Sequence, residues 1–141
     1  SQKQLDLLAP MFWRTSLSSG ERVFSQGDPA NDIYVLESGE VILRFFPYDG
    51  GSLDIETIRP GGVFGWSAAL GRETYTSAAI CVTDVRAIAT RGSDLRRLMR
   101  ENKALGVLLL DRMSQVVAHR LNSFRSQLTR LLRVEEEAER L

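Results

Sequence analysis

The segment that decides the fold reads GERVFSQGDPANDIYVLESGEV and covers residues 20–41. It contains two short runs rich in apolar and aromatic residues, Arg22–Ser25 and Asp32–Glu37. Gly27-Asp28-Pro29 separates the two runs, and Ser38-Gly39 closes the second. Short runs of this kind between glycine-containing turns are typical of β-strands. The segment therefore predicts two strands connected by glycine-dependent turns.

The same texture continues to about residue 91. Four further β-rich runs are present, and they are Glu40–Phe46, Leu53–Ile58, Ser77–Val82 and Val85–Thr90. Turn signals separate them, among them Asp49-Gly50-Gly51 and Pro60-Gly61-Gly62. Several short strands at near-regular spacing favour an antiparallel sandwich, roll or barrel.

Helical patterns flank the β-rich region. Apolar residues at helical spacing predict an N-terminal helix over residues 4–13, within a helical segment of about 1–18 that packs on the β-rich region. After Gly92, Ser93 is a suitable N-cap for a short helix ending near Glu101, and Asn102 is a suitable N-cap for a longer helix from Lys103.

The longer helix carries an apolar residue at every seventh position from Leu110 to Ala138. The residues predicted to form the seam are Leu110, Met113, Val117, Leu121, Phe124, Leu128 and Leu131. Such a repeat favours pairing with a partner helix, and a helix of about 30 residues would span about 45 Å. Packing on the chain's own β-region is compatible with it, since one end can cover the strands while the other pairs.

Composition limits the kinds of site that the chain can carry. Its 141 residues are enough for one domain with a sizeable core. A single cysteine, Cys81, excludes an internal disulfide and cysteine-based metal clusters, and His119 is the only histidine. No apolar run approaches the roughly 18 residues of a membrane span, so we expect a cytoplasmic protein with no membrane partner.

The net charge of zero is a balance between segments. Residues 1–90 hold 7 basic and 11 acidic residues, and residues 91–134 hold 10 and 3. The last seven residues hold 1 basic and 4 acidic residues. The basic residues from Arg91 to Lys103 lack interleaved aromatic residues, so we interpret them as a solvated face rather than a nucleic-acid site.

Two separated motifs resemble the cyclic nucleotide-binding domain family. Residues 20–41 are similar to that family's opening, and Pro60-Gly61-Gly62-Val63-Phe64-Gly65 is similar to the approach to its phosphate-binding cassette. The resemblance covers about residues 5–135. It implies a single domain over 1–141, mostly β with α, built as a double-stranded β-helix (a jelly-roll-like β-roll). The roll would cover residues 19–92, with the cassette at 61–77 and the C-terminal helices at 93–141, the last of them long and dimerising.

The cassette departs from the family at two positions. Members that bind cyclic nucleotides resemble Phe-Gly-Glu-x-Ala-Leu followed by an arginine about ten residues after the glycine; the glutamate accepts from the ribose hydroxyl and the arginine pairs with the phosphate. Here the two positions hold Trp66 and Tyr75. Loss of the arginine removes a charge-assisted hydrogen bond worth about 1.5–3 kcal/mol. We therefore expect weak binding of cyclic AMP or cyclic GMP.

Three interpretations of the altered cassette stay open. Arg72 reaches the phosphate instead; Trp66 and Tyr75 form flat walls for another ligand; or the aromatic side chains fill the pocket. Backbone N–H groups after Gly65 and nearby hydroxyls would complete a site. The candidate ligand-binding residues are Phe64, Gly65, Trp66, Ser67, Ala68, Arg72, Tyr75, Thr76 and Ser77.

The expected function is non-catalytic, since no nucleophile–base set, metal cluster or phosphate loop with lysine is present. The resemblance implies a regulatory sensor module that binds a cyclic nucleotide weakly, or another small anionic ligand, and acts as a homodimer through the C-terminal helix. One alternative is a ligand-free dimerisation or docking scaffold with a protein partner. The other is the sensor fragment of a transcription regulator, because the sequence ends at Leu141 without a helix-turn-helix pattern and so predicts no direct nucleic-acid binding.

Overall fold

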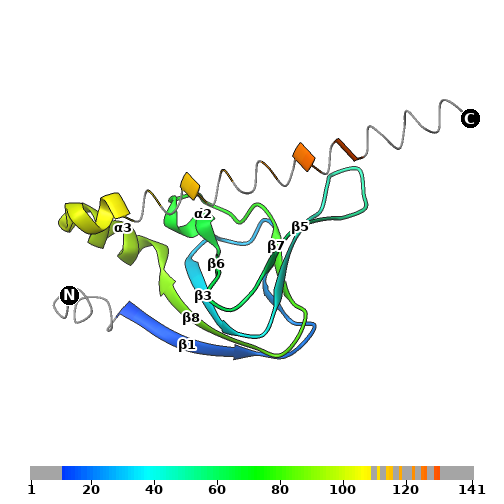
Figure 1. Ribbon diagram of the computed structural model, residues 1–141, viewed down its shortest axis with the longest axis horizontal. Helices are drawn as coiled ribbons and strands as arrows, with labels where there is room; N and C mark the ends of the chain where they lie inside the picture. Colours follow the sequence, from blue (N-terminus) through cyan, green and yellow to red (C-terminus); the bar gives the residue numbers. More distant parts are fainter. Residues whose placement is uncertain are drawn as a thin grey trace, which may run out of the picture.

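Two four-stranded antiparallel sheets face each other in the computed structural model (Figure 1). The structure describes residues 11–108 and, beyond them, residues 111, 114, 115, 118, 122, 125, 126, 129 and 130. The first sheet has the order β1 (Phe12–Leu17), β8 (Val85–Arg91), β3 (Asp32–Ser38) and β6 (Val63–Phe64). The second has the order β2 (Arg22–Phe24), β7 (Ala78–Cys81), β4 (Val41–Phe45) and β5 (Leu53–Ile58). The predicted β-roll is confirmed.

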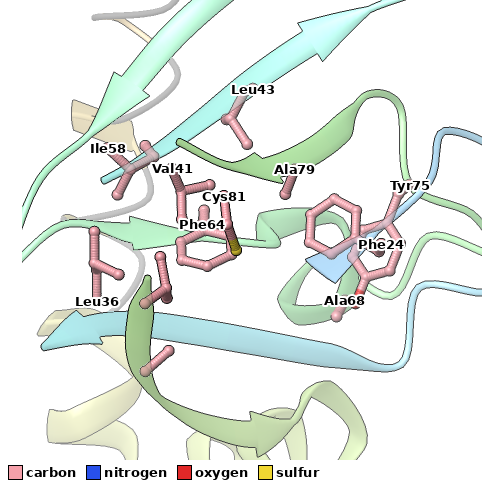
Figure 2. Packing of buried hydrophobic residues seen from close by; sticks show 12 residues of the cluster. Phe24, Leu36, Val41, Leu43, Ile58, Phe64, Ala68, Tyr75, Ala79 and Cys81 are labelled. Atoms are coloured by element: carbon pink, nitrogen blue, oxygen red, sulfur yellow. The ribbon is translucent and has the colours of Figure 1, made fainter. Parts of the chain in front are cut away.

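Apolar side chains from both sheets meet inside the roll. We call this set the roll core, and its buried members are Phe24, Leu36, Val41, Leu43, Ile58, Phe64, Ala68, Tyr75, Ala79, Cys81, Val85 and Ala87. Figure 2 shows Phe64 beside Cys81, and the rings of Phe24 and Tyr75 overlapping at the end of the roll next to Ala68.

All six predicted strands occur with bounds within two residues of those expected.

The prediction of an N-terminal helix is wrong for residues 12–17, which form β1. Its six residues pair in continuous antiparallel register with β8, from Phe12 opposite Thr90 to Leu17 opposite Val85. The Thr90 hydroxyl also donates to the Met11 carbonyl at 3.0 Å. The edge of β8 therefore recruits this segment as a strand, and the roll begins at Phe12 rather than at residue 19. Residues 1–10 lie outside the described part of the chain.

Two described helices, α2 and α3, lie next to each other (Figure 1). Helix α2 covers Trp66–Ala69, and α3 covers Gly92–Glu101. The predicted N-cap at Ser93 is wrong, because the N-cap is Arg91, two residues earlier, and it makes no side-chain capping hydrogen bond. The Gly92 N–H donates to the Asn31 carbonyl at 2.8 Å, so a tertiary contact fixes the helix start.

A further helical segment begins at Lys103, as predicted from its cap. The backbone N–H of Leu105 donates to the Asn102 side-chain oxygen at 3.2 Å. The described residues between 111 and 130 are helical and exposed. The predicted seam lies outside the described residues in all its members, so it stays a prediction; they are Leu110, Met113, Val117, Leu121, Phe124, Leu128 and Leu131.

Candidate functional site

The cassette backbone passes from β6 through Gly65 into α2. Gly65 has φ 85°, a left-handed conformation that glycine adopts without strain. A Cβ at this position would lie only 2.8 Å from the Asp32 carbonyl oxygen, so the absence of a side chain also permits close packing against β3. Gly71, with φ 76°, lies just beyond the other end of α2. The short helix is thus held between two glycines, as expected for Gly65.

The loop after α2 pairs with the Gly27-Asp28-Pro29 turn. Gly27 N–H donates to the Tyr75 carbonyl at 2.9 Å, and Tyr75 N–H donates to the Asp28 carbonyl at 3.0 Å. The Asp28 carboxylate accepts from the backbone N–H of Ser25 at 2.9 Å and stabilises the turn. The Gly27-Asp28-Pro29 turn therefore also positions Tyr75, which stands where nucleotide-binding members of the family have an arginine.

The Tyr75 side chain points into the roll core, where it is 5% exposed. Its ring stacks on Phe24 with centroids 3.6 Å apart and planes 10° from parallel. The hydroxyl donates to the Asp32 carbonyl at 2.6 Å and accepts from the Asp32 N–H at 3.0 Å. Burial raises the pKa of the Tyr75 phenol, so the group is neutral at physiological pH. These contacts give the Tyr75 side chain a structural role in the roll core.

Trp66 faces α3 instead of the roll interior. It belongs to a second group of buried residues, which we call the joint cluster: Ile33, Trp66, Ala69 and Leu95. The indole Nε1–H is buried and has no hydrogen-bond partner in the described part of the chain. The structure therefore does not bring Trp66 and Tyr75 together as two walls of one pocket.

The other candidate residues divide into buried and accessible groups. Phe64 and Ala68 have no exposed surface, and Ser77 is buried at 8%. Ser67 is half-buried on α2, while Arg72 and Thr76 are exposed in the loop between α2 and β7. The accessible polar groups of the cassette are therefore the Ser67 and Thr76 hydroxyls and the Arg72 guanidinium.

Helices α2 and α3 meet through a backbone contact that the sequence analysis missed. Gly92 packs directly on the Ala68 carbonyl, leaving no room for a Cβ. The same carbonyl accepts a hydrogen bond from the Arg96 guanidinium. The small residues at 68 and 92 were the only available signal, and nothing in the spacing indicated that they touch.

Asp32 is a titratable group close to this contact. Burial raises the pKa of its carboxyl, and the positive charge of Arg91, its neighbour across β3 and β8, partly offsets this effect. The described residues contain no group of three or more potential metal ligands. None of the described helices is long and apolar enough to cross a bilayer.

The sequence is similar to a known protein family and to individual proteins of known name. The profile of a family described as "Cyclic nucleotide-binding domain" matches residues 14–102. The chain is 27% identical over 113 residues to a CRP-like cAMP-activated global transcriptional regulator of Mycobacterium tuberculosis, covering 80% of this chain and 49% of that protein. It is 28% identical over 98 residues to the cyclic AMP receptor protein of Thermus thermophilus, covering 70% and 45%. The chain thus spans about half the length of these relatives.

Solved structures agree with the fold. The catabolite activator protein of Thermus thermophilus superposes with a TM-score of 0.73 at 25% identity, covering 93% of this chain and 60% of that chain. A c-di-GMP responsive global regulator of Xanthomonas campestris superposes with a TM-score of 0.80 at 18% identity, covering 93% and 64%. The second likeness concerns the fold alone.

Proposed function

The chain belongs to the cyclic nucleotide-binding domain family, and we propose that it is the non-catalytic ligand-sensing part of a transcription regulator. One relative is named a global transcriptional regulator and another a cyclic AMP receptor protein, and the chain covers about half of each. In this proposal a small ligand binds at the cassette, and α3 transmits the effect to the helical segment from Lys103 onward.

The position of α2 carries this proposal. Ala68 packs into the roll core, while Trp66 and Ala69, on the same short helix, pack on Leu95 of α3. A ligand that shifts α2 would therefore change contacts with both parts at once. It moves α3 only to the extent that it binds the two arrangements with different affinity.

The ligand class is inferred from the accessible groups. Ser67 and Thr76 supply hydroxyls, and Arg72 supplies a positive charge. Tyr75 offers no charge to a phosphate, so we propose that cyclic AMP or another small anionic ligand binds weakly, about one to two decades below a site with an arginine there.

We also propose that the protein is a homodimer through the seam from Leu110 to Leu131. Val107 and Leu108, at the start of this helical segment, are 68% and 58% exposed, which favours a partner beside them. Phe124→Glu should then convert a dimer into a monomer in light scattering, and an unchanged mass would contradict the seam.

A ligand-free scaffold is the second candidate function, because the Tyr75 ring is stacked on Phe24 inside the roll core. Calorimetric titration of the full chain with cyclic AMP, cyclic GMP and c-di-GMP separates the two. The sensor proposal expects measurable heat with at least one nucleotide and about a tenfold loss of affinity in Arg72→Ala. Arg59→Ala, which removes another exposed arginine in the β5–β6 turn, is the control. No heat at millimolar nucleotide would contradict nucleotide sensing and favour the scaffold.

A further inference from the structure

At the start of β3, next to α2, the backbone N–H and C=O of Asp32 pair with the Tyr75 hydroxyl instead of with a neighbouring strand. Along β3, the N–H and C=O of Leu36 pair with Gly62 and Gly61, and Tyr34 pairs with Phe64 of β6. In an antiparallel strand, every second residue directs its backbone N–H and C=O toward the same neighbouring strand. Asp32 therefore directs its N–H and C=O toward the same side as Tyr34 and Leu36, the side on which β6 lies. Strand β6 has ended there, since the chain turns at Gly65 into α2.

The Tyr75 hydroxyl makes the two backbone hydrogen bonds that a residue of a neighbouring strand would otherwise make with Asp32. It donates to the Asp32 carbonyl and accepts from the Asp32 N–H, so both groups are paired. The hydroxyl has little freedom to leave, because the ring is stacked on Phe24 and the backbone is bonded to Gly27 and Asp28. A buried N–H and C=O without partners would be costly, so the contact is a strong constraint.

The residue next to Asp32 is hydrogen-bonded directly to the start of α3. The preceding residue, Asn31, accepts from the N–H of Gly92, the first residue of α3, at 2.8 Å. Gly92 in turn packs on the Ala68 carbonyl, to which Arg96 donates. The cassette loop, the start of β3 and the start of α3 are therefore joined by direct contacts.

We propose that Tyr75 is a positioning residue whose hydroxyl ties the cassette loop to the start of α3 without any ligand. This deepens the proposed function and rests on it, since it identifies what holds the output helix before a ligand binds. The protein itself then supplies the link between cassette and helix, and a bound ligand acts by strengthening or breaking a link that already exists.

Amide hydrogen exchange on the full chain without ligand tests this. Tyr75→Phe keeps the stacked ring and removes the hydroxyl. We expect the amides of Asp32 and Gly92 to exchange about tenfold faster, while amides of β4, which report global unfolding, change less. Tyr34→Phe is the matched control, because Tyr34 stacks on Phe64 and its hydroxyl has no hydrogen bond within the described residues. It should leave Gly92 unchanged.

Two outcomes of this experiment would overturn the proposal. If Asp32 exchanges faster and Gly92 does not, the constraint ends at β3. If all amides, including those of β4, accelerate by the same factor, Tyr75 serves general stability only.

A second pair of variants tests the same link from the other side and covers the case in which Tyr75→Phe does not fold. Arg96→Met loosens α3, so the Asp32 amide should exchange faster, because coupling between two sites is reciprocal. Arg97→Met is the control, since Arg97 pairs only with Asp94 on the same helix among the described residues. An unchanged Asp32 amide in Arg96→Met would also overturn the proposal. No ligand is added, so failure of the nucleotide titrations leaves this result intact.

Discussion

The roll core and the joint cluster meet at α2, and they differ in how completely they are buried. Most members of the roll core are at most 2% exposed, with Phe64 and Val41 at zero, although Phe24 keeps 7%. In the joint cluster, Trp66 and Leu95 keep 8% and 6% exposure, and the Trp66 Nε1–H has no partner in the described part of the chain. The core is also built from both sheets, while the joint depends on one short helix, one strand and α3.

This difference indicates which contact yields first. Regions with fewer buried contacts open locally at a lower free energy than the whole domain. We therefore expect α3 to separate from α2 while the roll stays folded. A sensor needs this arrangement, because its output element must move without unfolding the part that holds the ligand.

The largest effect is expected from Phe64→Ala in the roll core. Removing a fully buried aromatic ring should lower the free energy of unfolding by about 3–5 kcal/mol. Urea unfolding monitored by far-UV circular dichroism measures this loss. A cost below about 1 kcal/mol, far under the usual range for such a truncation, would mean that the roll core is not the main source of stability.

A smaller and more local effect is expected from Leu95→Ala in the joint cluster. The cost should be about 2 kcal/mol, at the low end for a buried leucine, because the site lies at an edge. In a Trp13→Phe background, Trp66 emission should shift to the red while the circular dichroism of the strands is retained. Leu98→Ala is the control, since Leu98 is buried on α3 but outside the joint cluster. A loss of strand signal in Leu95→Ala would show that the roll and the joint unfold as one unit.

The smallest effect is expected from Asp32→Asn, between the two clusters. Burial raises the pKa of the Asp32 carboxyl in the folded protein, so its contribution to stability is present at low pH. That contribution is lost as the pH rises through the raised pKa. The variant should therefore melt at a higher temperature than the wild type at neutral pH, with a smaller difference at acidic pH, where the carboxyl is protonated. Asp49→Asn, at the exposed β4–β5 turn, is the control. An equal difference at both pH values would contradict a role for the charge.

The roll was predictable because its signals are local. Alternating apolar runs and glycine turns identified six strands, and Gly27, Gly39 and Gly65 all have positive φ as expected. The prediction failed at β1, where apolar residues at helical spacing continue to Phe12, because the pairing with a strand as distant in the chain as β8 has no local signal.

The candidate site stays a prediction, and the geometry of its residues was not predictable from the sequence. Spacing from Gly65 identified positions 66 and 75. Whether each side chain faces the roll or α3 depends on the packing of α3, and the partner of Tyr75 is a backbone segment that carries no side-chain signal. The three interpretations of the altered cassette, which rest on side-chain chemistry alone, therefore could not be distinguished from the sequence.

The burial of Cys81 makes the molecule convenient for spectroscopy. It is the only cysteine, it is 1% exposed, and burial raises the pKa of its thiol, so little reactive thiolate forms at neutral pH. A cysteine introduced on the exposed face of α3, for example Arg97→Cys, can then be labelled selectively. In the Trp13→Phe background, where Trp66 is the only tryptophan, the distance-dependent interaction between Trp66 and such a label would report the separation of α2 and α3 in solution for each nucleotide added.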